Sequence, residues 1–316
     1  MIATSGGDAL CPQILGHEPV RAAFTRALER HRVAHAYLFT GPSGVGKRAF
    51  AEGLAAAILC PRTPVGACGD CPSCTTFRSG NHPGYSLVAP RDGAISIEIA
   101  QIRETIEALS VRTGERRVLI VDPADAMPPA SANAFLKTLE EPPAGIVFLL
   151  VTSEPSQLLD TIHSRCHRVG FTGLEPETFA RVLADHEVAA GEASLLYPLS
   201  SGSPGLALRL REGIEACGGA DVFADLLDGR GLERPDALLE LVPALRSDEP
   251  KRDRVRRLLE LVIDGLRGRR PVDDPDLRER VAARAFEVAK LYRGLDVNLN
   301  AELVLERLAR CLRAGR

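Results

Sequence analysis

The feature that most constrains this chain is the stretch Gly41-Pro42-Ser43-Gly44-Val45-Gly46-Lys47. It follows the apolar run 36–40 and precedes the alanine-rich segment 49–57. A buried strand, a glycine-rich turn and a helix in this order form a phosphate cradle, in which backbone N–H groups, the helix dipole and the lysine face the anion. We predict a nucleotide-binding α/β domain whose phosphate-binding residues are Gly41, Gly44, Gly46 and Lys47. The alternative is a glycine-rich turn without a ligand.

The residue after the lysine does not suit an active NTPase. A Ser or Thr hydroxyl normally ligates Mg²⁺ there, whereas Arg48 has only donors. A second apolar run, 117–121, ends in Asp122, where a metal-orienting carboxylate would lie, but Pro123 takes the place of the Glu that would polarise water. We interpret Asp122 as a strand-end cap. The sequence thus predicts a nucleotide-binding fold with a broken metal site.

Four cysteines lie close together just after the helix that follows the loop, at Cys60, Cys68, Cys71 and Cys74. Four thiolates can close a tetrahedron around Zn²⁺, and no carboxylate or open position indicates catalysis. The segment 60–74 is rich in Pro and Gly, so a structural zinc would replace a core that it cannot build. Buried reduced thiols and redox-active cysteines are the alternatives.

A third buried strand is predicted at 145–152, after a helix at 131–141 that Ser131 would cap. Thr152 ends this strand, where ligands collect in open α/β sheets, so it is a candidate phosphate sensor. Simple β propensity is the other interpretation of this threonine. Beyond Phe171 the strand pattern stops. Short helices are predicted there at 176–185, 191–199 and 204–212, followed by a longer helical segment at 222–314. One further short helix is predicted before Phe171, at 157–162.

Charge and hydropathy narrow the classes of function. The 316 residues carry a formal net charge of −3, which argues against a broad basic face for nucleic acid. The basic clusters 251–257 and 267–270 are interpreted as solvated helix faces. The longest apolar run, 146–151, is too short to cross a bilayer, and the N-terminus does not resemble a signal peptide. We expect a cytoplasmic protein without membrane contact.

Several motifs follow one another in a distinctive order. They are the phosphate loop with its cysteine insert, Asn81-His82-Pro83-Gly84, Asp122, the run Ala132–Pro143 that ends in Leu-Glu-Glu-Pro-Pro, Thr152-Ser153-Glu154-Pro155, Ser164-Arg165-Cys166 and Gly202-Ser203-Pro204-Gly205. This order resembles the bacterial clamp-loader AAA+ ATPases, and within them the delta-prime type of DNA polymerase III subunit. The resemblance covers residues 14 to 210 well and the remainder only by length and helicity.

The resemblance implies an α/β architecture in three parts: an AAA+ P-loop parallel-sheet domain with the zinc-binding insert (1–170), a small helical lid (171–215) and an all-α collar that oligomerises (216–316). In that family the Ser-Arg-Cys arginine reaches the ATP site of the next subunit. Arg165 would therefore act in trans as an arginine finger. A helix-end salt bridge or a C-cap is the alternative. The lid's sensor arginine would fall where this chain has Pro204.

Arg48, Pro123 and Pro204 together favour a non-hydrolysing stator subunit of the DNA polymerase III holoenzyme, a DNA-directed DNA polymerase assembly. Its cofactor would be structural Zn²⁺, and its P-loop would be vestigial, with nucleotide binding left open. The implied partners are gamma/tau and delta subunits in a hetero-pentamer and, through that complex, the sliding clamp and primer–template DNA. An active ATPase of the gamma/tau type is the alternative. A zinc-bearing nucleic-acid adaptor is a third reading, which the acidic net charge opposes.

Overall fold

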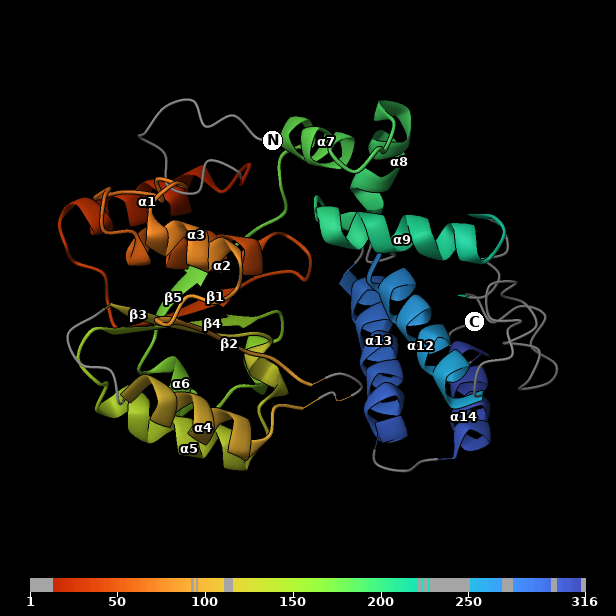
Figure 1. Cartoon of the computed structure of the whole chain (residues 1–316). Coiled ribbons are helices and arrows are strands. Elements are labelled where there is room, and N and C mark those ends of the chain that lie inside the picture. The colour runs from red at the N-terminus through yellow and green to blue at the C-terminus, as the bar shows by residue number, and fades with distance from the viewer. Residues whose placement is uncertain are drawn as a thin grey trace. The chain divides into compact units, whose positions relative to one another are not determined.

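The chain divides into two compact units, Met1–Leu174 and Glu175–Arg316, in the computed structural model shown in Figure 1. The structure describes residues 14–91, 94, 96–110, 116–220, 223, 227, 251–268, 275–296 and 300–313. The first unit contains strands and helices, whereas the described elements of the second unit are helices. This agrees with the end of the strand pattern near Phe171 in the sequence.

The first unit contains a five-stranded sheet in the order β2-β3-β4-β1-β5, with every strand parallel to its neighbours. The strands are β1 (Ala36–Thr40), β2 (Tyr85–Val88), β3 (Arg117–Val121), β4 (Ile146–Thr152) and β5 (His167–Gly170). The central strands β3, β4 and β1 are buried along their whole length. Near-continuous apolar runs of this kind are typical of a parallel sheet covered on both faces.

Helices cover both faces of this sheet (Figure 1). On one side lie α1 (Glu18–Glu29), α2 (Lys47–Leu59) and α3 (Pro72–Arg78), and on the other lie α4 (Ile99–Ser110), α5 (Pro129–Glu140) and α6 (Asp160–His163). Alternate residues of β1 enter different cores. Phe39 packs in the core that contains Phe50 of α2, whereas Leu38 packs in the core that contains Phe135 of α5. This is the two-residue period of a strand buried on both faces.

Two local predictions are wrong. Helix α5 begins at Pro129 rather than at Ser131. Ser131 lies inside the helix, where its buried hydroxyl donates to the carbonyl oxygen of Ile97 at 2.9 Å, and a proline in the first turn starts the helix instead. The helix expected at 157–162 is a 3₁₀ turn, η2 (Pro155–Gln157), followed by the short α6.

The second unit is helical in the part that the structure describes. Its elements are α7 (Pro176–Ala184), α8 (Ala190–Ser200), α9 (Pro204–Ala216), α12 (Lys251–Gly268), α13 (Pro275–Asp296) and α14 (Ala301–Arg313). The three short helices expected after Phe171 occur at the predicted positions, while most of 222–250 lies outside the described residues. The division into a lid (171–215) and a collar (216–316) stays a prediction. Within the described ranges, no helix is long and apolar enough to cross a bilayer.

Candidate functional site

The predicted phosphate loop lies between the carboxyl end of β1 and the first residue of α2. Three of its glycines have positive φ: Gly41 at 142°, Gly44 at 78° and Gly46 at 99°. Residues with a Cβ rarely adopt such conformations. Lys47 is 6% exposed, and its Nζ donates to the carbonyl oxygens of Gly41 at 2.6 Å and Pro42 at 2.7 Å. The lysine thus lies over the loop at the N-terminus of α2, the arrangement that favours an anion.

The base of the loop is held by residues from other elements. A Cβ on Gly41 would lie 2.2 Å from the carbonyl oxygen of Phe171, so the two backbones approach closely here. His17 supports the other side. Its Nε2 donates to the carbonyl oxygen of Val45 at 2.8 Å, and its ring meets Phe171 edge-on with centroids 4.8 Å apart. Burial lowers the pKa of His17, although the hydrogen bond to Val45 opposes this shift.

Arg48 occupies the position of the metal-binding hydroxyl and contacts two carboxylates. Its Nε donates to Glu52 at 3.0 Å, and its Nη1 lies 3.8 Å from Oδ2 of Asp122. Burial opposes the charge of Arg48, but these carboxylates outweigh it and raise its pKa. Burial likewise raises the pKa of Asp122, against the opposing effect of Arg48 and Lys47. A guanidinium therefore lies beside the carboxylate that would orient a metal in an active NTPase.

Thr152 lies at the same edge of the sheet as the phosphate loop, because its register partner in β1 is Thr40. It is fully buried. Its hydroxyl donates to Oδ1 of Asp125, in the 3₁₀ turn η1 (Ala124–Ala126), and accepts from the N–H of Glu154 at 3.0 Å. The structure places Thr152 where the sequence predicted, with hydrogen bonds to its own chain. A phosphate-sensing role stays a prediction.

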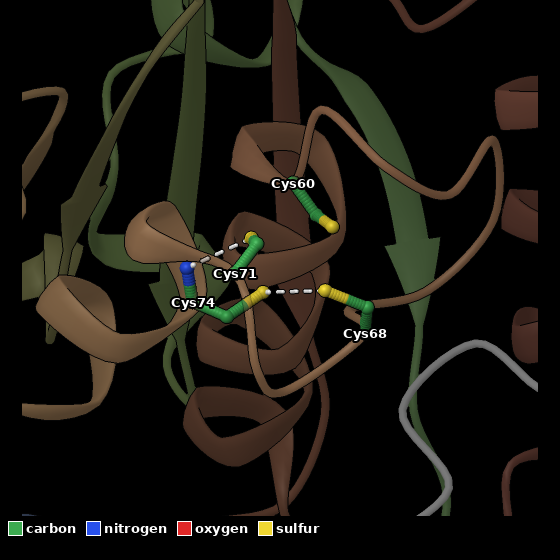
Figure 2. A group of neighbouring side chains, drawn as sticks. All are labelled: Cys60, Cys68, Cys71 and Cys74. Carbon is green, nitrogen blue, oxygen red and sulfur yellow. Dashed lines mark hydrogen bonds between the residues drawn. The ribbon is translucent and has the colours of Figure 1, made fainter.

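The side chains of the four cysteines lie close together (Figure 2). They gather where α2 ends, whereas the phosphate loop precedes the first residue of that helix. Cys60 directly follows α2, Cys71 caps α3, Cys74 lies in the first turn of α3, and Cys68 comes from the loop between these helices. All four Sγ atoms lie within 4.8 Å of one another, and those of Cys68 and Cys74 are 3.8 Å apart. Sulfur atoms bound to one Zn²⁺ at about 2.3 Å in a tetrahedron are about 3.8 Å apart. This cysteine cluster therefore fits one such ion.

The thiols of the cysteine cluster differ in their affinity for protons. Burial by itself would raise the pKa of Cys60, but hydrogen bonds from the Thr63 hydroxyl and from the N–H groups of Cys68, Arg62 and Thr63 lower it to about 6. Burial raises the pKa of Cys74 to about 12. A soft cation bound by the four sulfur atoms would favour the thiolate form of all of them.

Arg165 follows α6 and lies at the opposite edge of the sheet from the phosphate loop. It lines an open groove of about 650 Å³ together with His35, Leu139, Glu140, Ser164, Cys166 and His167. His35 directly precedes β1, whereas the phosphate loop directly follows that strand. The two sites are therefore separated by the length of β1, roughly 16 Å at about 3.3 Å per residue.

The Arg165 guanidinium is oriented by groups of its own unit. Its Nη2 lies 2.6 Å from Oε1 of Glu140, and its Nη1 donates to the carbonyl oxygen of Thr161 and to the Ser164 hydroxyl, each at 3.0 Å. The side chain of Arg165 is 33% exposed. The helix-end ion pair that the sequence left as the alternative is thus present, and the Arg165 side chain remains partly exposed. Glu140 was missed as its partner, although it belongs to the Leu-Glu-Glu-Pro-Pro motif.

Pro204 begins α9 in the second unit. The preceding Ser203 caps this helix, since its hydroxyl accepts from the N–H of Leu206 at 3.3 Å. A hydroxyl cap followed by proline is a common helix start. Position 204 therefore serves to begin the helix, where the clamp-loader resemblance would place an arginine nearby.

Comparison with known proteins identifies similar chains. Residues 16–175 match the family model described as DNA polymerase III, delta subunit. The chain is 42% identical over 188 residues to DNA polymerase III subunit delta' of Pseudomonas aeruginosa, a match that covers 57% of this chain and 57% of that protein. It is 36% identical over 231 residues to DNA polymerase III subunit gamma/tau of Mycobacterium bovis, covering 70% of this chain and 39% of that one. The match thus spans little more than half of the first relative and less than half of the second.

Among solved structures, the chain is similar to a DNA polymerase III gamma subunit-related protein from Thermotoga maritima. The TM-score is 0.46 at 17% identity, and the alignment covers 92% of this chain and 99% of that chain.

Proposed function

We propose a function from one premise: the chain belongs to the DNA polymerase III delta subunit family, whose model it matches over residues 16–175. The protein is a non-hydrolysing stator subunit of the clamp loader. Its Arg165 completes the ATP site of a neighbouring subunit, whereas its own phosphate loop does not hydrolyse ATP. Through the complex it takes part in loading the sliding clamp during DNA replication.

The observation that carries this proposal is the position of Arg165. The arginine lies at the amino end of β1 and the phosphate loop lies at the carboxyl end, so Arg165 is separated from its own nucleotide site by the length of that strand. A partly exposed arginine at this edge is available to the phosphates of another subunit, where it would stabilise the charge of the transition state. The contacts with Glu140, Thr161 and Ser164 support this role because they limit the conformations of the side chain.

The lack of hydrolysis is inferred from the chain's own phosphate loop. Arg48 replaces a metal ligand and contacts Asp122, and Pro123 supplies neither a carboxylate nor a base. The loop still has the backbone and the lysine that would hold an anion. Nucleotide binding without hydrolysis is therefore compatible with the site.

A structural zinc completes the proposal. The cysteine cluster has four soft ligands with the spacing of a closed tetrahedron. Such an ion would hold the end of α2 to α3, in a segment with little apolar core of its own. Its place at the far end of α2 from the phosphate loop indicates a structural role.

The second candidate function is an active ATPase of the gamma/tau type. It is favoured by the relative of that name, whose match extends over 70% of this chain, beyond the end of the first unit. The contact between Arg48 and Asp122 opposes it, since a motor subunit would need that carboxylate for Mg²⁺.

Reconstitution with candidate gamma/tau and delta subunits tests the proposal. The purified chain should co-elute with both subunits in one complex and should increase ATP turnover per gamma/tau subunit in the presence of clamp and primer–template DNA. A matched complex prepared with the Lys47→Ala variant should turn over ATP at the same rate, because the hydrolysing sites belong to the partners. Failure to assemble, or a loss of turnover with Lys47→Ala, would count against the stator role.

A further inference from the structure

The motif Asn81–Gly84 joins α3 to β2, and the proposed function leaves it without a role. Its histidine, His82, is bonded at both ring nitrogens. The N–H of Gly84 donates to Nδ1 at 3.0 Å, and Nε2 lies 2.9 Å from the hydroxyl oxygen of Ser73. Because Nδ1 is the acceptor, the neutral ring carries its proton on Nε2 and donates to Ser73.

Ser73 extends this chain of hydrogen bonds to α2. Its hydroxyl donates to the carbonyl oxygen of Leu59 at 2.8 Å. Leu59 is the last residue of α2 and precedes Cys60, while Ser73 lies in α3 between Cys71 and Cys74. The relay through Gly84, His82, Ser73 and Leu59, called the histidine relay below, therefore joins the two segments that carry three of the four cysteines.

The other end of the histidine relay is anchored in the sheet. The carbonyl oxygen of Gly84 accepts from the N–H of Val118 in β3 at 2.8 Å, and the N–H of Tyr85 donates to the carbonyl oxygen of His82 at 3.0 Å. A Cβ on Gly84 would lie 2.8 Å from the carbonyl oxygen of Arg116, so a larger residue would force the backbone to move. The backbone on the carboxyl side of His82 is thus held by the sheet, while the ring Nε2 contacts the helix that carries Cys74.

We infer that His82 is the positioning residue of the zinc centre. By holding Ser73 against the end of α2, it sets the spacing between Cys60 and the pair Cys71 and Cys74 before the ion binds. The inference rests on the zinc site of the proposed function. Groups hydrogen-bonded to metal ligands contribute about 10- to 100-fold to metal affinity in other proteins, and the histidine relay acts one step further out, through the backbone next to the cysteines. The histidine relay should contribute similarly because Pro- and Gly-rich loops hold their ligands weakly on their own.

The test compares zinc loss from four full-length proteins: wild type, His82→Ala, His82→Gln and the control His186→Ala, which removes an exposed histidine of the second unit. Each purified protein is first assayed for zinc content and then mixed with an excess of a chromogenic chelator under native conditions. We expect His82→Ala to release zinc about tenfold faster or more. The His82→Gln amide can still donate to Ser73, so its rate should return to within about threefold of wild type. His186→Ala should match wild type.

Cobalt substitution supplies a readout that general destabilisation would not reproduce. The visible absorption bands of Co²⁺ report the symmetry of its ligands, so His82→Ala should shift them and His82→Gln should restore them. If His82→Ala does not fold, Ser73→Ala breaks the same relay and should accelerate zinc release equally. Zinc release from these variants at the wild-type rate, with unchanged cobalt spectra, overturns the inference and leaves the zinc centre standing. If the wild-type protein contains less than half an equivalent of zinc, both the zinc centre and the role of His82 in it are wrong.

Discussion

The Arg48 guanidinium lies 3.8 Å from the carboxylate of Asp122, where an active P-loop NTPase would hold its metal ion. A cation fixed to the protein and a divalent ion would compete for the same carboxylate. The arginine is also held by Glu52 one helical turn away, which keeps it near the end of β3. Arg48 therefore removes the hydroxyl ligand of the metal and also places its own positive charge beside Asp122.

The first prediction is that the isolated protein has no Mg²⁺-dependent ATPase activity. Arg48→Thr alone should not restore turnover, because it returns a hydroxyl ligand while Pro123 still supplies no base. Release of phosphate from ATP by the purified chain is the measurement, with Lys47→Ala as the control for contaminating enzymes. Steady hydrolysis that disappears in Lys47→Ala would identify a motor subunit instead.

The second prediction concerns Asp122 and pH. Burial raises its folded-state pKa above the ordinary value of 3.8, so the folded protein binds this proton more tightly than the unfolded chain does. Stability is therefore lost as pH rises from the unfolded pKa through the folded one, and the penalty is complete above that window. Asp122→Asn should therefore make the protein more stable than wild type at pH 7, because it removes the buried charge.

Urea denaturation from pH 7 down toward pH 4 checks this prediction for Asp122. The advantage of Asp122→Asn over wild type should shrink as the pH falls, because the wild-type carboxyl becomes protonated and loses its penalty. A variant that is less stable than wild type at pH 7 would show that the ion pair with Arg48 outweighs the cost of burying the charge.

The third prediction concerns the close backbone approach at the phosphate loop, where a side chain on Gly41 would meet both an unfavourable φ and a collision. Gly41 and Gly80 both have positive φ, but an added Cβ meets the Phe171 carbonyl oxygen at 2.2 Å in the first case and nothing within 4 Å in the second. Gly80→Ala should cost about 1 to 2 kcal/mol from its φ alone. Gly41→Ala should cost about 3 kcal/mol or more. Equal losses in urea denaturation would show that the loop can move away from Phe171.

The fourth prediction is one zinc ion per chain, bound by Cys60, Cys68, Cys71 and Cys74. Elemental analysis of protein purified without added metal should give about one equivalent, and Cys74→Ser should reduce both the zinc content and the thermal stability. Cys217→Ser is the control, since Cys217 is a buried thiol of the second unit. Four freely titrating thiols in the wild-type cluster, with little zinc, would contradict the prediction.

Features that depend on neighbouring residues could be predicted from the sequence. The phosphate loop needs positive φ at fixed positions, and glycines at 41, 44 and 46 report that need directly. The cysteine cluster could also be predicted, because its four cysteines lie within 15 residues and their spacing allows the sulfur atoms to meet around one metal ion. The apolar runs of β1, β3 and β4 indicated buried strands for the same reason.

Features that depend on distant pairings could not be predicted. Glu140 meets Arg165, and Asp125 meets Thr152, only after the sheet and its helices have packed. Ser131 was expected to cap a helix because serine is common at helix N-termini. Its hydroxyl instead donates to the carbonyl oxygen of Ile97, which is distant in the sequence. When a side chain has several suitable hydrogen-bond or ion-pair partners, the tertiary fold decides which one it contacts, and the local sequence does not reveal it.

The trans role of Arg165 is the central claim, and ATP turnover by a reconstituted clamp loader tests it most directly. Complexes with wild type, Arg165→Ala, Arg165→Lys and the control Arg168→Ala, which removes a neighbouring β5 arginine that bonds Thr40, should first be shown to assemble equally. An arginine finger contributes about 10³-fold or more at the site it serves. Arg165→Ala should therefore abolish the share of turnover that comes from the adjacent site and slow clamp loading. Arg165→Lys should restore little, since an ammonium lacks the planar fork. If the Arg165→Ala complex hydrolyses ATP at the wild-type rate with clamp and DNA present, Arg165 is only the structural partner of Glu140.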